Sequence, residues 1–166
     1  MIGRKLVCTL AVAFVFIAPS RAQDALVAYK SLSPELALDL ARAALGECRK
    51  RGYQVAVAVV DRSGVTQVML RDRFAGAHTP ATAAGKAWTA ASFRTSTTEL
   101  VASTQPGMPQ AAVRNLPGAV ILGGGLVIEA QGSLIGAVGV SGAPGGDADD
   151  ACAKAGIEAV RDKLDF

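Results

Sequence analysis

Three short apolar runs in the last third of the chain, residues 119–122, 126–129 and 134–140, dominate its hydrophobic pattern. Each has the length of a β-strand, and glycine-bearing turns at residues 123–125 and 130–133 separate them. Periodicity alone does not distinguish such runs from buried helix, but their brevity and their valine and isoleucine content favour strands. The pattern therefore predicts a three-stranded antiparallel meander, whose apolar face needs a layer of helices to cover it.

A further pair of strands is predicted earlier in the chain. Residues 55–60 are nearly all apolar, which is typical of a central strand, and Asp-Arg-Ser-Gly at residues 61–64 supplies a turn. The returning run, residues 65–70, contains Thr66 and Gln67, so we expect it at the edge of the sheet. Hairpin and meander together predict five antiparallel strands.

Helical periodicity predicts the layers that cover this sheet. A serine N-cap, a proline in the first turn and an apolar stripe at four-residue spacing predict a helix at residues 33–51. An alanine-rich stretch predicts a second helix at residues 82–94, and a short helical turn is expected at residues 98–100. An acidic start and an apolar face predict a last helix at residues 147–163. We find no internal repeat and no second domain in the sequence.

The N-terminus has the pattern of a secretory signal peptide. Two basic residues precede an apolar run at residues 6–18, and the small residues Ser20 and Ala22 predict cleavage before Gln23. The apolar run is too short to span a bilayer comfortably. We therefore expect residues 1–22 to be removed and the protein to be exported, to the periplasm or to the outside of the cell.

Removal of this segment changes the charge balance. Three of the 17 basic residues and none of the 14 acidic residues precede residue 23, so residues 23–166, a single domain by length, would carry 14 of each. With His78 neutral, the mature net charge is about zero, which does not support nucleic-acid binding. The low charge and the 51% hydrophobic content of the full chain predict a homo-oligomer.

Two cysteines, Cys48 and Cys152, remain after the expected cleavage. Export permits a disulfide between them, because disulfides persist in oxidising compartments. Both lie on apolar faces of predicted helices, where free buried cysteine is common. The sequence favours two separate buried thiols, with the disulfide as the alternative.

Several enzyme classes are poorly supported by the motifs present. A single histidine cannot form a histidine-cluster metal site in one chain, and there is no Cys-x-x-Cys pair, which argues against a tetrahedral zinc site. Ser141, in Gly-Val-Ser-Gly, lacks the spacing of a nucleophile elbow, and His78 is the only histidine that could act as its base. The sequence therefore argues against a serine hydrolase.

Three features are candidates for ligand binding, each with a structural alternative. The glycines at residues 123–125 could cradle an anion with their amides, but no helix start or lysine follows at phosphate-loop spacing, which favours a simple turn. His78 lies in a loop of small residues before a helix, where a histidine is usually solvated but would here also meet a ligand. Trp88, on the alanine-rich helix, is more typical of a core residue than of a stacking platform.

Three segments are distinctive when taken together: VAVAVVDRSGVTQVMLRDRFAG, KAWTAASF and LPGAVILGGGLVIEAQGSLIGAVGVSGAPGGDADDACAKAG. They resemble the GlcG/HbpS family, a family of haem-binding domains that includes the C-terminal domain of PduO-type adenosyltransferases. The resemblance covers residues 33–161. Its most specific parts are the VVDRSG turn, the LPG…GGGLVI segment and the IGAVGVSGA…D…C…AG ending.

This resemblance implies both a fold and a ligand. The fold is α/β of the α+β kind, a profilin-like sandwich in which a five-stranded antiparallel sheet packs with helices, assembled into symmetric oligomers. The ligand is haem, for a carrier or an accessory of a membrane sensor partner in haem or iron sensing, and haem degradation is an activity that the family suggests. In secreted haem-binding members a threonine oxygen at the start of a T-S-E-L stretch lies by the iron. The matching stretch here is Thr97-Thr98-Glu99-Leu100, which points to Thr97.

The region from His78 to Thr97 also offers what haem needs, which is an apolar slot, an axial donor and cations for the propionates. The axial ligand to the iron would be Thr97 or His78. The candidate cofactor-binding residues are Thr97, His78, Lys86, Trp88, Phe93 and Arg94.

We therefore predict an exported haem-binding protein. The alternative is an oligomeric enzyme or binding module for a small organic acid, in which the turn at residues 123–125 and His78 would face a carboxylate.

Overall fold

The computed structural model describes residues 26–164 of the 166-residue chain, so the predicted signal peptide lies outside the described residues. No helix within residues 26–164 is long and apolar enough to cross a membrane. In chain order the elements are α1 (Pro34–Lys50), β1 (Ala56–Asp61), β2 (Thr66–Arg71), α2 (Thr79–Phe93), α3 (Thr97–Ser103), η1 (Ala111–Asn115), β3 (Gly125–Ala130), β4 (Ser133–Ser141), α4 (Gly146–Glu158) and η2 (Arg161–Lys163).

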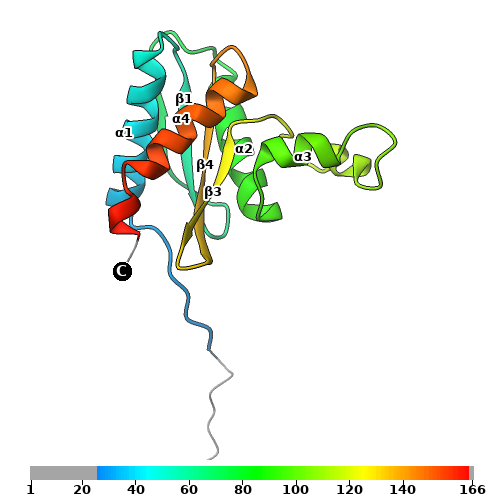
Figure 1. Ribbon diagram of the computed structural model, residues 1–166, viewed down its shortest axis with the longest axis horizontal. Coiled ribbons are helices and arrows are strands. Elements are labelled where there is room, and N and C mark those ends of the chain that lie inside the picture. Colours follow the sequence, from blue (N-terminus) through cyan, green and yellow to red (C-terminus); the bar gives the residue numbers. More distant parts are fainter. Residues whose placement is uncertain (1–25, 165–166) are drawn as a thin grey trace, which may run out of the picture.

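These elements form three layers. Helices α1 and α4 lie side by side on one face of the sheet, and α2 covers the other face (Figure 1). Helix α3 and the segment that follows it project away from this body (Figure 1). The α+β class predicted from the sequence is confirmed.

The described sheet has four strands in the order β2-β1-β4-β3, and every neighbouring pair is antiparallel. The predicted hairpin is confirmed, because β1 pairs with β2 and places Val59 opposite Val68. Strand β1 also pairs with β4, which puts Val59 opposite Val138, so β1 is central as predicted. Strand β2 lies at the edge, and its residues are exposed or half-buried.

The fifth predicted strand, residues 119–122, does not form. The amide of Val120 donates instead to the hydroxyl of Thr89 on α2, at 2.9 Å, and the Val120 side chain packs over Gly85 of the same helix. Sheet pairing begins only at Gly124, whose carbonyl accepts a hydrogen bond from the amide of Val140 at 2.9 Å. The predicted meander is therefore a two-stranded hairpin of β3 and β4, and the sheet has four strands rather than five.

The two faces of the sheet pack in different ways. Val57 and Val59 of β1 join the large aliphatic side chains beneath α1 and α4, whereas Ala58 faces α2 in a cluster built mostly from alanine. Gly139 of β4 lies directly under α2, because a Cβ atom there would be 2.1 Å from the carbonyl oxygen of Ala83. The backbone of α2 therefore lies almost against the sheet, which only the smallest residues permit.

The predicted helix ends are confirmed in part, because the last helix, predicted at residues 147–163, ends at Glu158 and the short helix η2 follows separately. The Ser33 hydroxyl accepts a backbone hydrogen bond of 3.2 Å at the start of α1, and the helix ends before Gly52, which has φ +80°. Helix α2 starts at Thr79, earlier than predicted, since Pro80 needs no amide hydrogen bond in a first turn. The helical turn predicted at residues 98–100 is part of α3.

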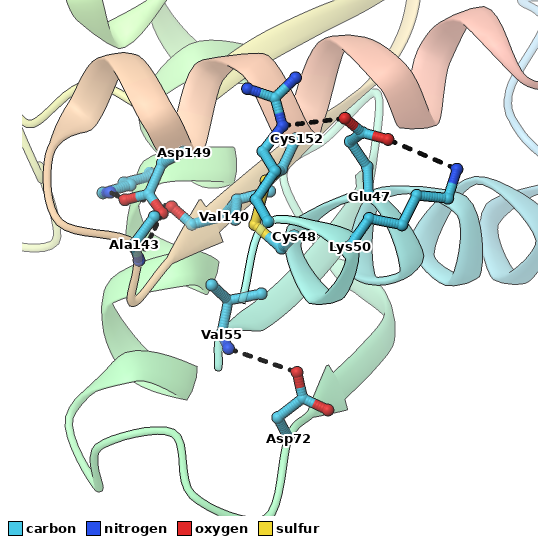
Figure 2. The surroundings of a disulfide bond; sticks show 11 residues. Glu47, Cys48, Lys50, Val55, Asp72, Val140, Ala143, Asp149 and Cys152 are labelled. Carbon is cyan, nitrogen blue, oxygen red and sulfur yellow. Dashed lines mark hydrogen bonds and ion pairs between the residues drawn. A yellow bond between two sulfur atoms is a disulfide. The ribbon is translucent and has the colours of Figure 1, made fainter. Parts of the chain in front are cut away.

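Cys48 and Cys152 form a disulfide, so the prediction of two separate thiols was wrong. The apolar faces were predicted correctly, because both side chains are fully buried where α1 and α4 meet (Figure 2). Helical periodicity places each cysteine on a face of its own helix. It does not say that two helices whose cysteines are 104 residues apart will bring those faces into register.

Candidate functional site

A pocket of about 430 Å³ lies between the start of α2, the turn before β3 and the loop from β4 to α4. Glycine supplies five of its lining residues, so much of its wall is main chain. The polar side chains that line it are His78, Thr79, Thr82, Lys86, Ser141 and Asp149.

A buried ion pair lies at this pocket. The Nζ atom of Lys86 is 2.7 Å from Oδ2 of Asp149 and 2.9 Å from the carbonyl oxygen of Val140, and the two charged side chains are only 3% and 5% exposed. The other carboxylate oxygen, Oδ1, accepts the amide of Ala143 at 3.0 Å (Figure 2). Both oxygens of the carboxylate are therefore hydrogen-bonded without a ligand.

Each charged side chain of the Lys86–Asp149 pair can remain buried only while the other is present. Burial raises the pKa of the Asp149 carboxyl above its usual value, while the hydrogen bond and the positive charge of Lys86 oppose that rise. Removing either partner would leave a buried charge without compensation, which is far more costly than losing an exposed ion pair. The pair therefore fixes α2 to the start of α4.

Sequence reasoning missed Asp149 as a site residue, because an acid in the first turn of a helix already has a local explanation. The sequence around Lys86, the partner of Asp149, did offer a clue. Ala83 and Ala90, three and four residues from Lys86, lie on the buried face of α2. A lysine on an apolar helix face needs a buried acidic partner, and the candidates were the aspartates of the last helix.

The turn at residues 123–125 is held by side chains of the protein. The amide of Gly124 donates to Oδ1 of Asp150 at 2.6 Å, and the amide of Gly125 donates to Oγ1 of Thr97 at 2.8 Å. Gly124 has φ +114°, a conformation that favours glycine. Since two of its three amides already have acceptors, the segment fits the simple turn better than a cradle of three free amides.

The six candidate haem residues do not gather at one place. His78 is exposed at the pocket, and Lys86 is buried beside it. Trp88 lines a separate groove on α2. Phe93 and Arg94 lie at the far end of α2, about 22 Å along the helix axis from His78.

Thr97 and His78, the two candidate iron ligands, have opposite environments. Thr97 is fully buried, and its hydroxyl is bound to the main chain of Gly125 through a 2.8 Å and a 3.4 Å contact. The exposed His78 side chain makes no hydrogen bond within residues 26–164. No group of three His, Cys, Asp or Glu in the same part of the chain could hold a metal ion.

Fold and pocket together define an antiparallel α+β sandwich with a polar pocket where the end of β4 meets the start of α4. The chain belongs to the HbpS-like family. The model of this family, described as "Haem degrading protein HbpS-like", matches residues 32–158.

Solved structures and curated proteins support this assignment. The crystal structure of a double mutant of HbpS from Streptomyces reticuli has a TM-score of 0.77 and 36% identity, covering 90% of this chain and 98% of that one. The crystal structure of PduOC in complex with haem has a TM-score of 0.73 and 32% identity, covering 78% and 94%. The corrinoid adenosyltransferase PduO of Citrobacter freundii is 33% identical over 114 residues, which are 68% of this chain and 34% of PduO. The chain therefore spans about a third of that enzyme.

Proposed function

We propose that the protein is an exported haem-binding protein that carries haem or assists in haem or iron sensing. Membership of the HbpS-like family and the similarity to PduOC, which was crystallised with haem, support the proposal. The observation on this chain that carries it is the exposed imidazole of His78, which has no hydrogen-bond partner within residues 26–164.

The exposed side chains at His78 and just before it in the chain fit haem better than the groups inside the pocket. Leu122 lines the pocket with His78 and is 56% exposed, and Phe74, four residues before His78, is 79% exposed. The guanidinium of Arg73 lies 5.9 Å from the centre of the Phe74 ring and is a cation of the kind that pairs with a propionate. The interior is lined by charged and hydroxyl groups, which suit an apolar macrocycle poorly.

His78 would hold the iron that bound haem supplies, through one of its ring nitrogens. Because this donor is exposed, much of the haem would remain accessible, and an accessible ligand suits transfer or sensing better than storage. Thr97 is the alternative iron ligand, and its contact with Gly125 would have to open first. Phe93 and Arg94, at the end of α2 shortly before Thr97, belong to that alternative, whereas Trp88 lines a separate groove.

The test is a haem titration followed in the Soret region. His78→Ala should shift the Soret band and lower the affinity for haem by about tenfold or more, because the nitrogen donor is lost. Thr97→Ser is the matched control, since it keeps the hydroxyl that holds Gly125, and it should change neither the band nor the affinity.

Two other outcomes would count against His78. If Thr97→Val shifts the band and His78→Ala does not, Thr97 is the ligand. If neither substitution changes the spectrum or the affinity of a folded protein, haem uptake is nonspecific and the proposal fails. Degradation of haem would appear in the same samples as loss of the Soret band with time.

Export and assembly form the remaining part of the proposal. The Cys48–Cys152 disulfide supports export, since disulfides persist in oxidising compartments. Material from the native compartment should have the mass of a chain that begins near Gln23, and a mass that includes residues 1–22 would contradict export.

The low mature charge and the family support a homo-oligomer, with a membrane sensor as its partner. Light scattering at micromolar concentration should show several subunits, and a monomer would contradict this.

A further inference from the structure

Ser141, at the end of β4, brings an unpaired hydroxyl to the pocket. It is 5% exposed and lines the pocket, and its side chain makes no hydrogen bond within residues 26–164. Among the described side chains, the only polar atom sealed from solvent without a partner is Oε1 of Gln67. The Ser141 oxygen therefore has access to the pocket, where it can bind a ligand atom or water.

Further donors belong to residues that line the same pocket. Lys86 has three N–H groups, of which two are bound to Asp149 and to a main-chain carbonyl, so one is left. Helix α4 begins at Gly146, its N-cap residue Gly145 has no side chain to cap it, and both glycines line the pocket. The first amides of a helix have no acceptor within the helix and attract oxygen anions.

The charges around the pocket limit the ligand. Lys86 and Asp149 cancel formally, and Asp147 and Asp150 add two negative charges near the start of α4. A dianion such as phosphate would be repelled here about twice as strongly as a ligand with a single carboxylate. The volume of about 430 Å³ suits a small molecule.

We propose that this pocket binds a small monocarboxylic acid that carries a hydroxyl or keto oxygen beside the carboxylate. The carboxylate is held by the amides at the start of α4, and the second oxygen is held by the hydroxyl of Ser141 and the free N–H of Lys86. Its donors differ from the proposed haem donor, His78, but His78 lines the same pocket, so the site is tested in the haem-free protein.

The test is an NMR titration of the haem-free protein with lactate, propionate and inorganic phosphate, monitored at the amides of Gly142, Ala143, Gly145 and Gly146. Lactate and propionate have the same carbon skeleton and differ in one hydroxyl, so lactate should bind several-fold more tightly. Ser141→Ala should weaken lactate binding several-fold and reduce the preference over propionate to what the Lys86 N–H alone provides, which corresponds to the loss of one of two hydrogen bonds. Ser92→Ala, an exposed serine on α2, is the matched control and should have no effect.

Ser141→Ala should fold normally, because its hydroxyl has no partner in the described part of the chain. Equal binding of lactate and propionate by the wild type, or unchanged lactate binding by folded Ser141→Ala, would overturn the proposal. Tighter binding of phosphate than of lactate would overturn the choice of a monocarboxylate, and the absence of shifts with all three probes would overturn the site. None of these outcomes depends on whether haem binds at His78.

Discussion

Reduction of the Cys48–Cys152 disulfide should remove a large share of the stability of the fold. The two cysteines are 104 residues apart in sequence. In the chain-entropy description, a cross-link over that separation destabilises the unfolded state by about 4.7 kcal/mol at 25 °C. A domain has about 5–15 kcal/mol of stability in total, so the reduced protein would lose between a third and nearly all of it. At roughly 2–4 °C for each kcal/mol, the Tm should fall by about 10–20 °C.

The assay is urea unfolding of the oxidised and the reduced protein. Both cysteines are fully buried, so the protein should be reduced in denaturant and refolded under reductant. With an m value of about 2 kcal/mol per molar, the midpoint should fall by about 2 M. The Cys48→Ala/Cys152→Ala variant is the control, and reductant should not change its midpoint. A reduced protein within about 1 kcal/mol of the oxidised form would refute the reasoning, because the cross-link would then not limit the unfolded chain.

Three further predictions concern the α2 side of the molecule. Gly139→Ala places a methyl group 2.1 Å from a carbonyl oxygen of α2 and should lower the free energy of unfolding by about 3 kcal/mol. Gly46→Ala, whose new methyl group would have nothing within 4 Å, should raise the free energy of unfolding by up to about 1 kcal/mol. Urea unfolding compares the two variants. Lys86→Met should cost about 3–5 kcal/mol at neutral pH. The loss of Lys86 also raises the folded-state pKa of Asp149 further. A carboxyl group whose pKa is raised on folding contributes stability that is fully present below its unfolded-state pKa of 3.8, and this stability is lost as the pH rises through the folded-state pKa. The stability of Lys86→Met should therefore fall from acidic to neutral pH in unfolding titrations, and a rise relative to wild type would contradict this. Thr97→Val should cost about 1–3 kcal/mol by leaving a buried amide without its acceptor, and Thr97→Ser should restore most of that loss.

Local patterns in the sequence predicted the parts of the fold that depend on local physics. The apolar run at residues 55–60 required burial on both faces, and β1 is indeed central. The polar positions of the next run predicted an edge strand, and β2 is one. The strand expected at residues 119–122 does not form, because the local pattern does not determine which element the run packs against. An apolar run looks the same whether it pairs with a strand or packs against a helix, and the amide of Val120 binds a side chain of α2.

The candidate site depended on contacts between distant segments, and these were only partly predictable. The sequence singled out His78 and Lys86, which line one pocket, but not Ser141 or Asp149, which line it with them. Ser141 was weighed only as a nucleophile, because its role as a free hydroxyl follows from the absence of a partner in the folded chain. Lys86 and Asp149 are 63 residues apart, and no local pattern pairs them.

Sequence drift should be unequal on the two sides of the sheet. Toward α1 and α4, branched side chains such as those of Leu40 and Ile128 can exchange with others of similar volume at little cost. Toward α2, Gly139 has no smaller substitute, and a larger residue would push the helix outward and carry Lys86 away from Asp149. A library of variants selected only for folding should therefore keep glycine and alanine between α2 and the sheet while it shuffles valine, leucine and isoleucine on the other side. Those small residues between α2 and the sheet would then preserve the shape of the pocket.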